Sequence, residues 1–160
     1  MPANRSPEDF MREAISLSLE GMRQNSGGPF GAVVVKEGRA IGSGFNRVLE
    51  KNDPTAHAEM EAIREASSFL NTFDLTGCEI YASCKPCPMC LSAILWSRIS
   101  RIYFANETAD AAEIGFDDGR FYSAISGDSG AGSPEMVQIL RDEAMDAFVE
   151  WRLKGDRKNY

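Results

Sequence analysis

The side chains best suited to chemistry lie in two short motifs. His57, the only histidine of the 160 residues, begins His57-Ala58-Glu59, and two thiols lie in Pro86-Cys87-Pro88-Met89-Cys90. One imidazole and two thiolates suit Zn²⁺, and three protein ligands leave the fourth tetrahedral position open for water. Glu59 has no liganding need and can carry protons between that water, a ring nitrogen and a leaving amine. The two motifs therefore predict a catalytic zinc site with one ion per chain.

Other interpretations of these residues stay open at this point. Alone, His57 could be an ordinary histidine, and Cys87 and Cys90 could be a redox pair. With Cys84 they could also close a Cys₃His structural site in a non-enzymatic, zinc-stabilised interaction module. However, Cys84 precedes Pro86 at the end of an extended segment and should point elsewhere. A closed site would also leave Glu59 without a role, so we prefer the catalytic interpretation.

Composition excludes several classes of protein. The length of 160 residues suits one domain, and the chain has no apolar run of the roughly 20 residues that a membrane span needs. The N-terminus has no apolar region typical of a signal peptide. A net charge of -7 disfavours nucleic acid as a partner. All four cysteines lie between Cys78 and Cys90, which favours a reduced, cytoplasmic metal site over disulfides.

Hydrophobic periodicity predicts alternating helices and strands, which indicates a layered α/β fold. We expect helices at 7 to about 21–24, 55–70, 86–97, 108–114 and 142–154, and strands at 31–35, 40–45, 78–83, 101–105 and 136–140. Residues 46–54 should form a polar loop, and the Gly-, Ser- and Asp-rich residues 115–134 should be irregular.

Both motifs lie where a predicted helix begins. Ligands of α/β folds collect where helix N-termini meet strand ends. A helix N-terminus also lowers the pKa of a nearby thiol, so Cys87 and Cys90 should bind metal as thiolates. Their spacing of three residues places both sulfurs on one face of the first turn.

The combination of H-x-E with P-C-x-x-C is the signature of zinc-dependent deaminases. On these residues the chain resembles the cytidine deaminase superfamily, and within it the short bacterial zinc-dependent guanine deaminases. Further matching stretches are Gly27-Gly28-Pro29-Phe30-Gly31-Ala32-Val33, Asn52-Asp53-Pro54-Thr55-Ala56, Asp110-Ala111-Ala112-Glu113-Ile114-Gly115-Phe116-Asp117-Asp118 and the terminal Asn159-Tyr160.

The resemblance implies a three-layer α/β/α sandwich with a five-stranded mixed sheet, and hydrolysis of guanine to xanthine and ammonia. It implies that Phe30 packs on the purine, Asn46 hydrogen-bonds it, and Asp118 binds its polar edge. It also implies a homodimer of single deaminase domains (residues 1–160), in which the C-terminal helix and tail, residues 142–160, are exchanged. Tyr160 would then cap the pocket of the partner chain.

Several substrates remain open under the same chemistry. Guanosine, cytosine or another small aminated heterocycle would use the same zinc motifs, and the acidic charge makes tRNA adenosine a weaker alternative. Lys85 departs from the resemblance, because these enzymes usually carry Glu at that position. It lies two residues before Cys87, where it could change the field at the metal or simply point into solvent.

Overall fold

A mixed four-stranded sheet forms the centre of the molecule. The computed structural model describes residues 5–127 and 134–159. The sheet contains β1 (Gly31–Lys36), β2 (Arg39–Phe45), β3 (Cys78–Cys84) and β4 (Arg101–Asn106), in the order β2-β1-β3-β4. β1 runs antiparallel to both β2 and β3, whereas β4 runs parallel to β3. The parallel pair requires a crossover, which the helix between β3 and β4 supplies.

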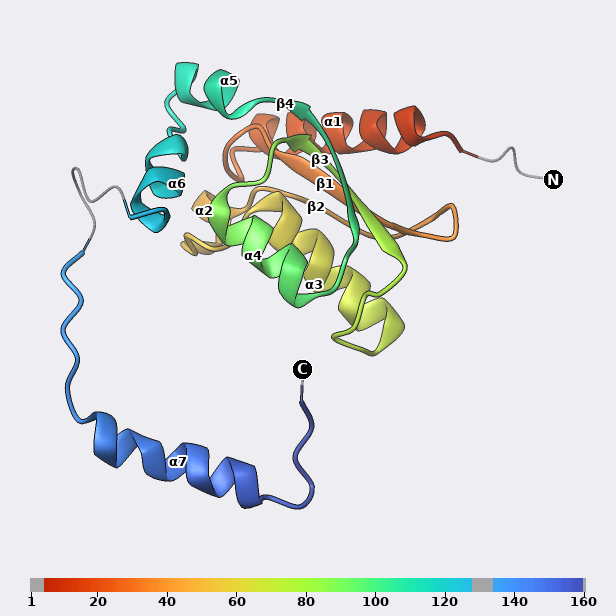
Figure 1. Cartoon of the computed structure of the whole chain (residues 1–160). Coiled ribbons are helices and arrows are strands. Elements are labelled where there is room, and N and C mark those ends of the chain that lie inside the picture. Colours follow the sequence, from red (N-terminus) through yellow and green to blue (C-terminus); the bar gives the residue numbers. More distant parts are fainter. Residues whose placement is uncertain (1–4, 128–133, 160) are drawn as a thin grey trace.

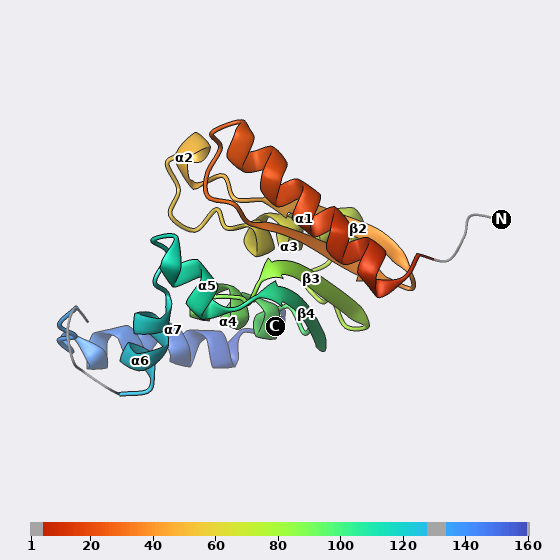
Figure 2. The same cartoon turned by 90° about the horizontal axis from the view of Figure 1, so that it is seen from above.

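Helices cover both faces of this sheet. α1 (Pro7–Arg23) lies on one face, and α3 (Ala58–Leu70) and α4 (Pro88–Trp96) lie side by side on the other (Figures 1 and 2). Ser6 caps α1 in a reciprocal capping box with Asp9, and Pro7 occupies the first helical position. The predicted start of this helix is therefore confirmed.

The two apolar cores follow the alternation of side chains along the strands. Val33 and Val35 of β1 and Tyr81 of β3 pack against Phe10 and Ala14 of α1. The intervening strand residues pack on the opposite face, where the buried cluster includes Ala32, Val34, Ile80, Ala58, Ala62, Ala66 and Ile94. This second core fixes α3 and α4 to the sheet.

α3 approaches β2 closely because the strand carries glycine where a side chain would collide. A Cβ on Gly42 would lie 2.4 Å from the carbonyl oxygen of Ala62, closer than two such atoms can approach. The small alanines of α3 complete this contact. The helix that begins beside His57 is thereby held tightly against the sheet.

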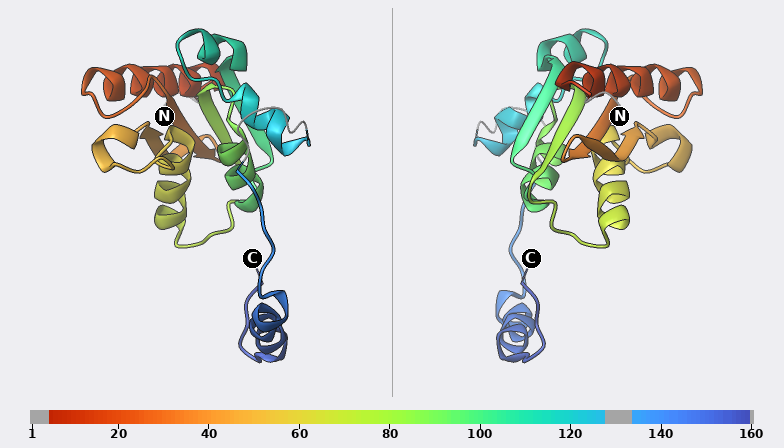
Figure 3. Two further views of the ribbon diagram at one scale, coloured as in Figure 1. Left: turned by 90° about the vertical axis from the view of Figure 1, so that its left-hand side faces the viewer. Right: turned by 90° about the vertical axis from the view of Figure 1, so that its right-hand side faces the viewer.

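Shorter helices lie at one end of the sheet. These are α2 (Val48–Lys51), α5 (Thr108–Glu113) and α6 (Gly119–Ile125). α2 lies inside the predicted loop 46–54, and α6 lies inside the stretch predicted to be irregular. α7 (Arg141–Leu153) matches the predicted C-terminal helix and stands apart from the layered body (Figure 3). Among the helices of residues 5–127 and 134–159, none has the length and apolarity to cross a membrane.

The prediction of a fifth strand at 136–140 is wrong. Within the described residues the sheet has four strands, and 134–140 have no regular structure. Met136, Val137 and Ile139 are largely exposed, and the segment leads from the body to α7 (Figure 1). A strand requires backbone partners, and among the described residues this segment pairs with no strand of the sheet.

The helix predicted at 86–97 begins two residues later than expected. Cys87 is its N-cap and Pro88, rather than Pro86, occupies the first helical position. The helix predicted at 55–70 likewise begins at Ala58, with His57 as its N-cap. Both shifts place a predicted metal ligand just outside its helix, in extended backbone.

Candidate zinc centre

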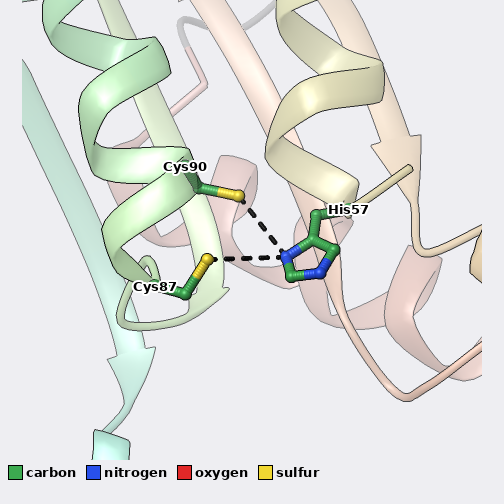
Figure 4. A group of neighbouring side chains, drawn as sticks. All are labelled: His57, Cys87 and Cys90. Atoms are coloured by element: carbon green, nitrogen blue, oxygen red, sulfur yellow. Dashed lines mark hydrogen bonds between the residues drawn. The ribbon is translucent and has the colours of Figure 1, made fainter. Parts of the chain in front are cut away.

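His57 and Cys87 occupy equivalent positions on neighbouring helices. Each is the N-cap of its helix, α3 or α4, with extended backbone and no capping bond from its side chain. Most N-cap side chains bond to the backbone of the first turn. Here the imidazole and thiol point toward each other instead, and Cys90 joins them from the first turn of α4 (Figure 4).

The three side chains have the spacing of a zinc site. Nδ1 of His57 lies 3.6 Å from Sγ of Cys87 and 3.5 Å from Sγ of Cys90. Zn–S bonds of about 2.3 Å and Zn–N bonds of about 2.0–2.1 Å at a tetrahedral angle separate N and S by about 3.5–3.6 Å. All three candidate donor atoms lie within 4.8 Å of one another. These residues therefore fit a zinc ion that keeps its fourth position open.

The pKa values of the two thiols are shifted in opposite directions. The hydrogen bond from Cys90, with a second from His57, lowers the pKa of Cys87 to about 4. The pKa of Cys90 is raised, first by its bond to Cys87 and then by burial. The bond to Cys87 raises the pKa of His57. One thiolate is thus already favoured where two helix N-termini converge.

Glu59 lies in the first turn of α3, two residues beyond His57, and is 8% exposed. Burial raises the pKa of its carboxyl group above the ordinary value. Its side chain lines the same cavity as His57 and Cys87. A buried carboxyl group beside an open metal position is suited to accept and return protons.

A cavity of about 770 Å³ opens in front of these groups. It is concave and largely apolar, as expected for a small-molecule site. All of the predicted site residues except Cys90 and Tyr160 line it: Phe30, Asn46, His57, Glu59, Cys87 and Asp118. Cys90 is fully buried, and Tyr160 lies outside the described residues.

Asp118 brings an unsatisfied acceptor to this cavity. It is the N-cap of α6 and makes no capping bond with its side chain. Its Oδ1 is buried, and it has no hydrogen-bond partner within the part of the chain that the structure describes. Burial, followed by the charge of Cys87, raises the pKa of the carboxyl group. Because buried polar atoms are rarely left unpaired, this oxygen is well placed for a ligand donor.

Phe30 and Asn46 also line this cavity. Phe30 is half-buried, and its ring meets Phe116 edge-on at 5.1 Å between centroids. Asn46 is buried, and its Oδ1 accepts a bond from the backbone N–H of Val48. Its NH₂ group is therefore the donor that it can offer to a ligand. The ring of Phe30, the NH₂ donor of Asn46 and the carboxylate acceptor of Asp118 thus line one cavity with two of the predicted metal ligands.

Cys84 and Lys85 lie outside the metal cluster. The thiol of Cys84 lies 3.7 Å from the carbonyl oxygen of Glu107, and burial raises its pKa to about 11. The group of candidate metal ligands found in the described residues contains His57, Cys87 and Cys90 without Cys84. Lys85 is exposed at the cavity edge, with Nζ 5.8 Å from the ring centroid of Phe104.

The sequence interpretation missed Tyr122, which contacts this site from α6. Its hydroxyl donates to the carbonyl oxygen of Pro86 at 2.6 Å. The Phe121, Tyr122 and Ile125 spacing hinted at a short helix, but the surrounding Gly, Ser and Asp residues masked that signal.

Comparison with known proteins shows that the predicted metal ligands lie within a known family region. Residues 4–106 match the family described as cytidine and deoxycytidylate deaminase zinc-binding region. The match includes both motifs but ends before Asp118 and Tyr122. The residues on the α6 side of the cavity therefore lie outside it.

Individual relatives extend the similarity over nearly the whole chain. Guanine deaminase of Bacillus subtilis (strain 168) is 44% identical over 153 residues, covering 96% of this chain and 98% of its own length. The X-ray structure of guanine deaminase from Bacillus subtilis superposes with a TM-score of 0.92 at 43% identity, covering 98% and 99% of the two chains. The resemblance predicted from the motifs is confirmed.

A tRNA-specific adenosine deaminase of Aquifex aeolicus (strain VF5) is similar over a shorter stretch. It is 52% identical over 77 residues, which cover 48% of this chain and 51% of that protein. The shared stretch is thus about half of each protein.

Proposed function

This chain belongs to the family that carries the cytidine and deoxycytidylate deaminase zinc-binding region, and from that membership we propose that it hydrolyses guanine to xanthine and ammonia. Support comes from a guanine deaminase that is 44% identical and matches over 98% of its own length. The reaction replaces the 2-amino group of guanine by an oxygen atom from water. One molecule of ammonia leaves for each xanthine formed.

The observation that carries this proposal is the shared cavity. His57, Cys87 and Glu59 line it, and so does Asp118, whose buried Oδ1 has no hydrogen-bond partner among the described residues. Guanine presents a row of N–H donors along its polar edge, which Asp118 would accept. Asn46 would donate to an acceptor atom of the ring, and Phe30 would pack on its face. A site built on such bonds rejects analogues that leave its polar groups unpaired.

His57, Cys87 and Cys90 would hold the zinc ion. Zinc bound in such a site lowers the pKa of water to about 7 and so supplies hydroxide at neutral pH. Glu59 would accept a proton from the attacking water through its carboxylate. It would pass that proton to a ring nitrogen and would then carry the second proton of the same water to the departing amine, which leaves as ammonia. One buried carboxylate thus serves successive transfers.

We further propose that the protein is a homodimer of single deaminase domains, residues 1–160, that exchange residues 142–160. α7 stands clear of the body, and its Phe148, Val149 and Leu153 are exposed (Figures 1 and 3). The body in turn exposes Phe69 of α3 and Leu95 of α4. Apolar patches of this kind mark interaction surfaces. An exchange of residues 142–160 between two identical chains would cover the apolar side chains of both α7 and the body.

The comparison structure supports the same arrangement of the tail. A superposition that covers 98% of this chain with a TM-score of 0.92 takes in α7 as well as the body. Exchange would bring the C-terminal residues to the partner's cavity. Tyr160 of the partner subunit would then close the site and exclude water during the reaction.

The cysteines support a cytoplasmic location for this enzyme. Cys78, Cys84, Cys87 and Cys90 are all free thiols. A reducing compartment keeps thiols in this state and available to metal.

Adenosine in tRNA is a second candidate, favoured by the Aquifex aeolicus relative. That similarity covers 48% of this chain, and a net charge of -7 opposes binding of a polyanion. Ammonia release from guanine, guanosine, cytosine, adenine and tRNA separates these possibilities. We expect the highest kcat/KM with guanine. Equal or faster turnover of cytosine or tRNA would refute the assignment.

A further inference from the structure

Residues 115–127 form a segment that little packing holds in place. Gly115 and Gly127 bound it with φ of 99° and 90°, which side chains other than glycine rarely adopt. Its helix, α6, contains no buried residue. At its start, Phe116 packs against Phe30. The rest of the segment therefore needs another contact to keep it near the site.

Tyr122 supplies this contact. Its hydroxyl donates to the carbonyl oxygen of Pro86 at 2.6 Å. Within the described residues, this is the only side-chain hydrogen bond that joins α6 to a residue outside residues 115–127, and Pro86 lies between β3 and α4. The Pro86 carbonyl belongs to the same peptide unit as the nitrogen of Cys87. The bond therefore links α6 directly to the backbone of a predicted zinc ligand.

Asp118 and Tyr122 are four residues apart at the start of α6, and residues with this spacing share a helix face. Asp118 lines the cavity together with His57 and Cys87, and the Tyr122 hydroxyl reaches the residue just before Cys87. Burial raises the pKa of Tyr122, so its hydroxyl stays a donor at neutral pH. Because Asp118 caps the helix that contains Tyr122, a shift of this helix away from Pro86 would move both residues.

We infer that Tyr122 is a positioning residue: its bond to Pro86 holds Asp118 at a set place over the zinc centre, ready for the substrate. The inference rests on the proposed function in taking guanine as the ligand of Asp118. Tyr122 itself touches neither substrate nor metal in this account. Its effect reaches the substrate through Asp118.

The first test is Tyr122→Phe in the zinc-loaded, full-length protein. This change keeps the ring and removes the hydroxyl, and one hydrogen bond corresponds to roughly a 2- to 10-fold effect. We expect KM for guanine to rise by that factor, with kcat within about twofold and zinc content unchanged. Tyr103→Phe is the matched control, since its hydroxyl lies near Arg101 on β4. Unchanged KM, or loss of zinc, in Tyr122→Phe would overturn the inference.

A double-mutant cycle separates positioning from a general structural role. If Tyr122 acts through Asp118, then Tyr122→Phe should change KM by less than about twofold in an Asp118→Asn background. A full, independent effect in that background would contradict the inference. A purely structural contribution of Tyr122 would raise KM by the same factor in the wild-type and Asp118→Asn backgrounds.

Amide hydrogen exchange tests the anchoring of α6 without a measurement of catalysis. Exchange in α6 should be faster in Tyr122→Phe than in the wild type or Tyr103→Phe, because the anchoring bond is lost. Unchanged exchange would overturn the inference. If the wild-type protein does not deaminate guanine, the proposed function is refuted. The exchange measurement still decides whether Tyr122 holds residues 115–127 in place.

Discussion

Sγ of Cys87 lies 3.6 Å from Nδ1 of His57, although 30 residues separate them in the chain. The two residues are the N-caps of adjacent helices on one face of the sheet. Their separation equals that of two ligands on a tetrahedral zinc ion, about 3.5–3.6 Å. The fold thus brings the two motifs together with the spacing that the metal requires.

Cys87→Ala should lose both zinc and activity, because two remaining ligands bind zinc weakly. We expect about one zinc per chain in the wild type, measured by elemental analysis of purified protein. Cys84→Ala is the control, since its thiol lies against the carbonyl of Glu107. It should keep its zinc. Zinc retained in Cys87→Ala, or lost in Cys84→Ala, would show that the ligand set is different.

Glu59→Gln should retain zinc and lose kcat by about 10²–10⁴, the usual contribution of general acid–base catalysis. The amide keeps the size of the side chain but cannot accept the proton. Glu61→Gln on the same helix is the control, because its carboxylate pairs with Lys51 and Arg64. More than about a tenth of the wild-type kcat in Glu59→Gln would remove Glu59 from proton transfer.

Asp118→Asn should reduce kcat/KM for guanine by roughly 10- to 100-fold, the range for a hydrogen bond to a charged group. The substitution removes the charge of the buried acceptor that we assign to the purine edge. Asp117→Asn changes its neighbour, which also lines the cavity but is exposed, and should have a smaller effect. Steady-state kinetics on both variants make the comparison. Similar losses in the two would show a general charge effect instead of a specific contact.

Removal of Lys158, Asn159 and Tyr160 should leave zinc content unchanged and sharply lower kcat/KM, because the partner's tail closes the cavity in our proposal. The full-length protein should sediment as a dimer. Full activity in the truncated protein would exclude the tail from the site.

Mixing the truncated protein with Glu59→Ala tests the exchange itself. One site of a mixed dimer would combine an intact Glu59 with an intact tail from the other chain. Activity should therefore reappear after subunit exchange. With exchange verified, absence of rescue would mean that each tail serves its own chain.

The zinc ligands could be predicted from sequence because their types and short spacings are local. The layered fold was also predictable, since Val33 and Val35 alternate with Ala32 and Val34 between two cores. The strand predicted at 136–140 is absent, because alternation along a segment identifies an apolar face but not a strand with which it can pair. Tyr122 could not be connected to Pro86, since that bond depends on how a segment between two glycines folds back.

The most direct test of the account follows xanthine formation from guanine in three samples of the wild-type protein. The first is zinc-loaded, the second is stripped with a chelator, and the third is stripped and then given zinc again. We predict xanthine with one equivalent of ammonia in the first and third, and neither product in the second. A folded, zinc-loaded protein that forms no xanthine, or equal xanthine formation after zinc is removed, would contradict zinc-dependent guanine deamination.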